Sequence, residues 1–285
     1  MKTYLDKNVY EAALERIAYC FQEFDNVLVA FSGGKDSGVM LNLCYDYANE
    51  HGLLDKLTMY HLDYEAQYQM TTEYVTRTFL EQFPGIRKMW YCVPIKAQSA
   101  CALGEPYWTP WDAAKKKLWV RAMPENPYVV HEGNLDVPFR HGMVDYEFQD
   151  KLSRHFAKKR GTTAVMVGLR ADESLNRYAA VARGKKRRSY EGRKWITQTS
   201  AVTANVYPLY DWRVSDIWTA TARFGFDYNR LYDLLYQAGL TAGQMRVASP
   251  FNDCAQESLK LYKVIDPSNL SLIHISEPTR LALIS

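Results

Sequence analysis

The residues best suited to chemistry stand together in one short segment: Ser32, Gly33, Gly34, Lys35, Asp36 and Ser37. The apolar run 27–31 precedes them and residues 38–43 follow, a pattern that predicts a buried strand, a glycine turn and a helix. Glycine lets the backbone approach a ligand closely, and the first N–H groups of a helix have no intrahelical partner. Serine hydroxyls and a lysine ammonium add donors and positive charge. We therefore expect this loop to bind the phosphates of a nucleotide.

The spacing of the loop differs from that of Walker-type loops, which need a four-residue spacer before Gly-Lys-Ser/Thr. It resembles the SGGxDS loop of the adenine nucleotide α-hydrolase (PP-loop ATPase) superfamily. Members of that superfamily cleave ATP between the α- and β-phosphates or bind a sulfonucleotide in the same place. The alternative is a glycine turn that binds nothing. The order of strand, loop and helix favours the resemblance.

A second motif follows the apolar run 164–167, and its residues are Gly168, Arg170, Glu173, Ser174 and Arg177. It resembles the G-x-R-x-x-E-S-x-x-R element of the phosphoadenosine phosphosulfate (PAPS) reductase family. Arginines offer planar forks that match phosphate oxygens, and the resemblance implies that Glu173 holds a guanidinium group or a metal. The alternative is a capped helix with i,i+4 charge pairs on its surface.

The resemblance also implies a mechanism. Lys35, Arg170 and Arg177 would neutralise the charge that develops as pyrophosphate leaves, and Mg²⁺ would bridge the phosphates with help from Asp36. Asp63 ends the predicted strand 57–62, in a region that meets the adenosine in the family resembled. One interpretation places its carboxylate on the ribose or a metal, and the other leaves it as a strand-end acid that faces water.

Strands predicted at 27–31, 57–62, 87–93, 164–168 and 205–209 alternate with helices at 12–24, 38–50, 71–82, 145–160 and 214–223. This alternation predicts an α/β, Rossmann-like, doubly wound parallel sheet of five strands. The resemblance implies the strand order 3-2-1-4-5, which places a ligand crevice between strands one and four. Residues 94–142 are rich in proline, glycine and tryptophan, and we expect them to form an inserted aromatic lid or a satellite core.

The remaining sequence divides the chain into 1–235, 236–269 and 270–285. A further family element matches three short runs, 208–212, 216–218 and 228–232, the first of which contains Pro208, Asp211 and Trp212. These runs are interpreted as support for the fold. Residues 243–267 resemble the start of the extra domain in immunoglobulin-binding regulator A-type proteins. Residues 270–280 resemble a translated sequencing adapter, so the natural protein is expected to be longer; the alternative is a genuine apolar strand.

The five cysteines contain no C-x-x-C pair, so no iron–sulfur cluster is expected. The residues after Cys254 lack the glycine and histidine of the E-C-G-x-H segment that reductases of this family use. No apolar run approaches the roughly 20 residues that span a bilayer, and the start does not read as a signal peptide, so we expect a cytoplasmic protein without a membrane partner. The basic run 183–195 is a candidate site for nucleic acid or a solvated loop. The core of this basic patch is Lys185, Lys186, Arg187 and Arg188.

These observations predict an ATP-binding enzyme that cleaves ATP at the α-phosphate by adenylyl transfer and uses Mg²⁺. One alternative is a sulfonucleotide (PAPS) reductase whose thiol lies outside this sequence. Another is a nucleotide-sensing regulatory or DNA-associated protein without turnover. The sequence leaves the acceptor and the oligomeric state open, a homodimer being one option.

Overall fold

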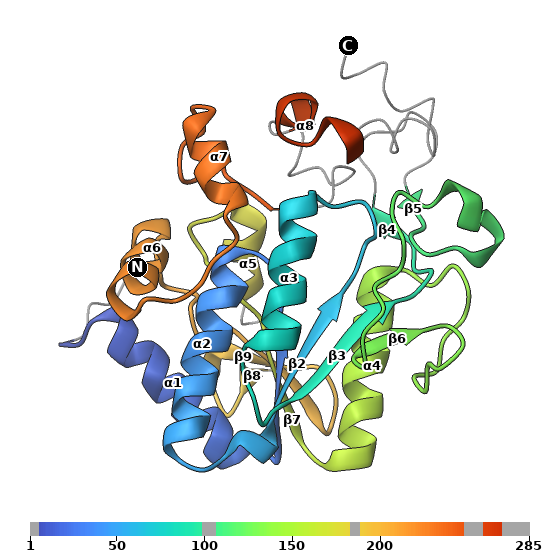
Figure 1. The fold of residues 1–285 in the computed structure, drawn as a ribbon. Helices are drawn as coiled ribbons and strands as arrows, with labels where there is room; N and C mark the ends of the chain where they lie inside the picture. Colours follow the sequence, from blue (N-terminus) through green and yellow to red (C-terminus); the bar gives the residue numbers. More distant parts are fainter. Residues whose placement is uncertain (1–5, 99–106, 183–188, 248–258, 270–285) are drawn as a thin grey trace. The chain divides into compact units, whose positions relative to one another are not determined.

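The structure is a computed structural model that describes residues 6–98, 107–182, 189–247 and 259–269 (Figure 1). The chain divides into two compact units. Unit 1 consists of Met1–Tyr60, Phe83–Arg87 and Leu152–Asp227, and unit 2 of His61–Gln82, Lys88–Lys151 and Tyr228–Ser285.

Hydrogen bonds join eight strands into one sheet in the order β6-β3-β2-β1-β7-β10-β9-β8. The bounds are β1 Asn26–Ala30, β2 Leu57–Leu62, β3 Arg87–Cys92, β6 Val129–His131, β7 Thr163–Met166, β8 Ser189–Tyr190, β9 Arg193–Gln198 and β10 Thr203–Val206. Strand β1 pairs in parallel with β2 and β7, and β7 pairs in parallel with β10. The predicted α/β class and the order 3-2-1-4-5 are therefore confirmed as β3-β2-β1-β7-β10.

The predicted number of five strands is too low for the described part of the chain. Strand β6 extends one edge, and β9 and β8 continue the other edge in antiparallel fashion. A separate two-stranded sheet joins β4 (Ala97–Gln98) and β5 (Tyr107–Trp108). Four of these strands, β4, β5, β6 and β8, have only two or three residues, too few for hydrophobic alternation to reveal them. Strand β9 has six residues, and only one of them, Ile196, is buried.

The helices are α1 Val9–Glu23, α2 Lys35–Glu50, α3 Gln69–Glu81, α4 Asp145–Arg160, α5 Leu175–Ala182, α6 Val214–Phe224, α7 Leu231–Gln237 and α8 Leu259–Ile265, with 3₁₀ turns η1 Leu54–Lys56 and η2 Ala113–Leu118. Helix α1 begins three residues before its predicted start because Asn8 and Glu11 form a capping box. In the described residues, every helix falls short of the length and apolar character that a bilayer crossing requires.

The core of unit 1 surrounds β1, whose residues Val27, Leu28 and Val29 are fully buried. Helix α2 packs against α1 and α6. Ile17 and Phe21 of α1 are buried as well. Because its strand and its helices are buried on their apolar faces, unit 1 holds the loop between β1 and α2 on rigid elements.

Unit 2 has its own core, built around Trp90 of β3, which is fully buried. The ring of Phe79 from α3 lies 5.0 Å from the Trp90 ring, and β6 pairs with β3 at Trp90 and Val129. Unit 2 also contains all the described residues of the segment 94–142, predicted as an aromatic insertion.

Candidate functional site

The loop predicted to bind phosphate connects β1 to α2. Gly33 has φ 76°, a left-handed conformation that strains any residue with a Cβ atom. Helix α2 then begins at Lys35, and its N-cap residue, Gly34, supplies no side-chain hydrogen bond. The backbone N–H groups in the first turn of α2 therefore donate no hydrogen bond to an N-cap side chain.

The two serines of the loop bind each other. The Ser37 hydroxyl donates to the carbonyl oxygen of Gly34 at 3.0 Å and lies 2.9 Å from the Ser32 hydroxyl. The Ser32 N–H also donates to the Ser37 Oγ, at 3.1 Å. These contacts fix the shape of the loop, and the proposed role of both hydroxyls as phosphate donors stays a prediction.

Two turns far apart in the sequence bring opposite charges together in unit 1. The Lys35 ammonium lies 3.5 Å from one carboxylate oxygen of Asp36, and the Arg170 Nε donates to the other. The Arg170 Nη1 donates to Asp172. Lys35 and Arg170 are only 8% and 3% exposed. Burial, reinforced by the charge of Arg170, lowers the pKa of Lys35, and the carboxylate of Asp36 opposes that shift.

Gly168 explains how these turns come so close. A Cβ atom at this position would lie 2.9 Å from the backbone nitrogen of Ser37 and 3.1 Å from the carbonyl carbon of Asp36. The backbone after β7 thus lies directly against the first turn of α2, and only glycine fits at position 168 without a shift of the backbone. The first two motifs meet at the carboxyl ends of β1 and β7, which are paired neighbours.

The rest of the second motif forms local contacts. The Arg177 Nε lies 2.9 Å from a carboxylate oxygen of Glu173, four residues before it. The Ser174 hydroxyl accepts from the Arg177 N–H at 3.2 Å in the first turn of α5. Ser174 therefore caps the first turn of α5. The i,i+4 pair accounts for Glu173 and Arg177 without a ligand, and their predicted roles at a nucleotide stay predictions.

The third motif supports the arginine turn. The carbonyl oxygen of Tyr210 accepts from the N–H of Ala171, beside Arg170, at 2.8 Å. Asp211 binds both terminal nitrogens of Arg16 on α1, at 2.7 and 2.8 Å. Sequence reasoning missed Arg16, although a lone arginine beside the apolar Ile17 was a signal that it pairs with a distant acid.

Asp63, in unit 2, is fully buried, so the interpretation that its carboxylate faces water is wrong. Both of its oxygens lie 2.6 Å from Arg121 Nη2, and one accepts from the Trp90 indole at 2.7 Å. The backbone N–H of Glu65 donates to it as well, at 2.8 Å. These partners make Asp63 an anchor of the inserted segment, while its predicted contact with a ribose or metal stays a prediction.

Several predicted features lie outside the described residues. They are the basic patch of Lys185, Lys186, Arg187 and Arg188, the thiols of Cys101 and Cys254, and the tail 270–285. The described cysteines, Cys20, Cys44 and Cys92, are buried free thiols, and burial raises the pKa of each. Such thiols are poor nucleophiles. Within the described ranges no three histidine, cysteine or acidic side chains form a metal-binding group.

The mostly parallel sheet and the glycine loop at the end of β1 define a Rossmann-like α/β protein. A family model for the phosphoadenosine phosphosulfate reductase domain matches residues 26–238, and the chain belongs to this family. A second model, for a domain of unknown function named DUF3440, matches residues 239–274.

The chain is 35% identical over 266 residues to the uncharacterized protein YbdN of Escherichia coli K12. The similarity covers 92% of this chain and 64% of that protein, so the chain spans less than two thirds of this relative. The expected closeness to immunoglobulin-binding regulator A-type proteins stays a prediction.

Two solved structures show distant similarity. PAPS reductase from Candida auris, in a phosphate complex, is 14% identical with a TM-score of 0.45, and the match covers 87% of this chain and 97% of that chain. FMN adenylyltransferase from Candida glabrata, in complex with FMN and an ATP analogue, is 14% identical with a TM-score of 0.44. That match covers 81% of this chain and 62% of that chain.

Proposed function

We propose that this protein binds ATP with its phosphates on the first turn of α2 and cleaves it at the α-phosphate. The observation that carries the proposal is the contact of Gly168 with the backbone at Ser37. This contact brings the buried Arg170 to the N-terminus of α2, where no N-cap side chain binds the backbone N–H groups. Helix N-termini favour anions through their N–H groups and their dipole. The family to which the chain belongs is named for an adenine nucleotide substrate.

The proposed reaction is adenylyl transfer. A nucleophile of the acceptor forms a bond to the α-phosphorus, and the bond from that phosphorus to the bridging oxygen of the β-phosphate breaks. Lys35 and Arg170 stabilise the charge that grows on the departing pyrophosphate. Catalysis of this kind depends on positioning and electrostatics.

Mg²⁺ fits the residues of the site. Asp36 and Asp172 both accept hydrogen bonds from the guanidinium of Arg170 through their carboxylate oxygens, and Mg²⁺ is commonly bound by one or two carboxylates together with substrate phosphates. The two carboxylates balance the two cations, so phosphate binding requires Arg170 to exchange a carboxylate partner for a phosphate oxygen. Mg²⁺ supplies charge neutralisation when bound, and Asp36 and Asp172 are the residues that would hold it.

The test is to incubate the full-length protein with ATP labelled at the α-phosphate and separate the products. Formation of AMP or an adenylylated acceptor, together with pyrophosphate, supports the proposal. Saturable ATP binding without product supports the nucleotide-sensing alternative. Thioredoxin-dependent sulfite release from PAPS would establish the reductase alternative, which requires a thiol other than the three buried cysteines described above.

A further inference from the structure

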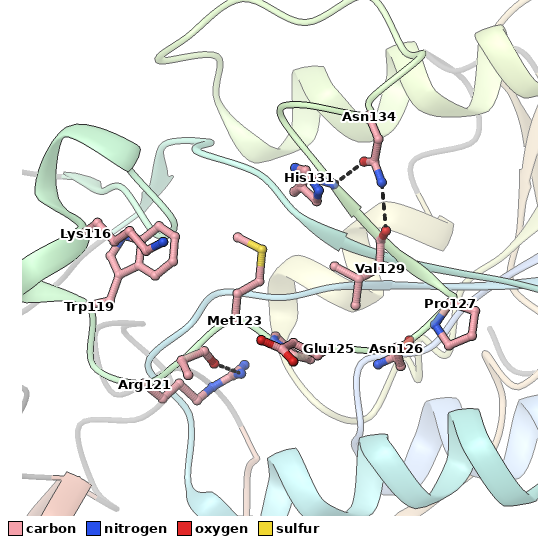
Figure 2. Close-up of a pocket in the computed structure, with 12 residues that line it drawn as sticks. Lys116, Trp119, Arg121, Met123, Glu125, Asn126, Pro127, Val129, His131 and Asn134 are labelled. Carbon is pink, nitrogen blue, oxygen red and sulfur yellow. Dashed lines mark hydrogen bonds between the residues drawn. The ribbon is translucent and has the colours of Figure 1, made fainter.

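The inserted segment of unit 2 lines an open cavity of about 730 Å³ that the proposed nucleotide chemistry does not use (Figure 2). This volume is within the range of roughly 300–1,000 Å³ typical of small-molecule sites. Its apolar wall includes Trp119, Met123 and Val129, and its charged groups are Lys116, Arg121 and Glu125. The cavity thus combines an aromatic surface with two cations and one carboxylate.

The aromatic wall is held in a fixed orientation. The indole N–H of Trp119 donates to the carbonyl oxygen of Asp112 at 3.0 Å. The ring of Trp111 meets the Trp119 ring edge-on, with centroids 5.2 Å apart. Lys116 Nζ lies 5.6 Å from the centre of the Trp119 ring, and within the described chain it pairs with no carboxylate. A planar ligand on this wall would therefore meet an ammonium group available for an anion.

His131 contributes a hydrogen-bond donor of defined tautomer. The N–H of Gly133 donates to the His131 Nδ1 at 3.1 Å, so in the neutral ring the hydrogen is on Nε2. A Cβ atom at Gly133 would lie 3.0 Å from the His131 ring. The backbone N–H of His131 also donates to the Asn134 side chain at 2.7 Å. His131 lines the cavity, and its Nε2–H group is a hydrogen-bond donor.

Buried carboxylates hold the cavity wall in place. Glu65 accepts from the N–H groups of Trp111 at 2.7 Å and Val120 at 2.6 Å, and Asp63 binds Arg121. Glu65 and Trp111 have φ values of 63° and 54°. Non-glycine residues rarely adopt this conformation, and it persists where surrounding contacts impose it, often at ligand sites. The wall is therefore built before a ligand arrives.

We propose that this cavity is a binding site for a planar organic anion, such as an aromatic carboxylate. The ring lies against Trp119 and Met123, and the anionic group meets Lys116 and the Nε2–H of His131. Arg121 adds little net charge, because Asp63 neutralises it. Among the described residues, Glu125 is the one carboxylate that lines the cavity, and it weakens the binding of an anion. The site requires no nucleotide, so its test is independent of the proposed ATP chemistry.

The experiment measures the binding of three indole compounds to the whole protein without nucleotide. Indole-3-propionate is the anion, indole-3-propionamide its neutral counterpart and tryptamine the cation. We expect the anion to bind about tenfold more tightly than the amide, and tryptamine to bind most weakly. The ε-methyl NMR signal of Met123, assigned with Met123→Leu, should shift by the ring current of the bound indole.

Charge variants separate this site from general attraction to a basic surface. Lys116→Gln should remove the preference for the anion, while Lys117→Gln, at a lysine that does not line the cavity, should preserve it. Glu125→Gln should strengthen binding of the anion about threefold. Equal affinities for the three compounds, equal effects of the two lysine variants, or an unmoved Met123 signal at millimolar ligand would each overturn the proposal.

Discussion

Replacing Gly168 with alanine should weaken nucleotide binding without unfolding the protein. The added methyl would lie 2.9 Å from the Ser37 nitrogen, whereas ordinary contacts begin near 3.4 Å, so the two backbone segments must separate by about 0.5 Å. Both contacting atoms belong to the backbone of a rigid helix and cannot rotate away. The methyl also covers an N–H group of the first turn.

The loss is equivalent to one hydrogen bond to a charged group, which contributes about 1.5–3 kcal/mol. The dissociation constant for ATP should therefore rise by roughly 10- to 100-fold. Isothermal titration calorimetry measures this change, and a thermal melt verifies that the variant is folded.

Gly243→Ala is the matched control, because a Cβ atom there meets nothing within 4 Å. It should bind ATP as the unmodified protein does. If Gly168→Ala and Gly243→Ala bind ATP with equal affinity while both are folded, the reasoning that places phosphates on the first turn of α2 is refuted.

Four other predictions concern charge and stability. Lys35→Ala should raise the dissociation constant for ATP by roughly 10- to 100-fold, because it removes a buried cation from the site; unchanged calorimetric affinity would contradict the assignment. Burial raises the pKa of Glu65 from 4.5 to about 7. Between these values the native state binds more protons than the unfolded chain, so stability should fall by up to about 3 kcal/mol as the pH rises through this window. Urea titrations at pH 5 and 8 should show that Glu65→Gln reduces this dependence of stability on pH. A wild-type stability that rises with pH in this window would contradict the raised pKa of Glu65. Arg16→Met leaves Asp211 without its partner, and the free energy of unfolding by urea should drop by about 2–3 kcal/mol; an unchanged midpoint would argue against this pair. Neutralising the basic residues of 183–194 should reduce the salt dependence of any nucleic-acid binding, and an unchanged slope would favour the solvated loop.

The loop between β1 and α2 could be predicted from the sequence because its signals are local. An apolar run, two glycines and a helical pattern occupy consecutive residues, and each carries physical information by itself. The strand order came from the family resemblance instead, since neither periodicity nor composition specifies which strands pair.

The partners of the charged residues could not be predicted, because they depend on contacts between distant segments. Arg170 binds Asp36, 134 residues away, and Asp63 binds Arg121, 58 residues away. The sequence therefore left open whether Asp63 contacts a ligand or faces water, although its carboxylate is fully buried. The insertion has no regular periodicity, so the anchoring of its backbone on Glu65 left no pattern to find.

The central claim is that backbone amides at the start of α2 bind the phosphates of an adenine nucleotide. The most direct measurement is the change in ¹⁵N–¹H amide NMR signals of the deuterated protein on addition of ATP, with adenosine as the comparison. The account predicts that Gly34, Lys35, Asp36 and Ser37 give the largest shifts with ATP and much smaller ones with adenosine. Unmoved signals for these four residues at saturating ATP, or equal shifts with both compounds, would contradict it.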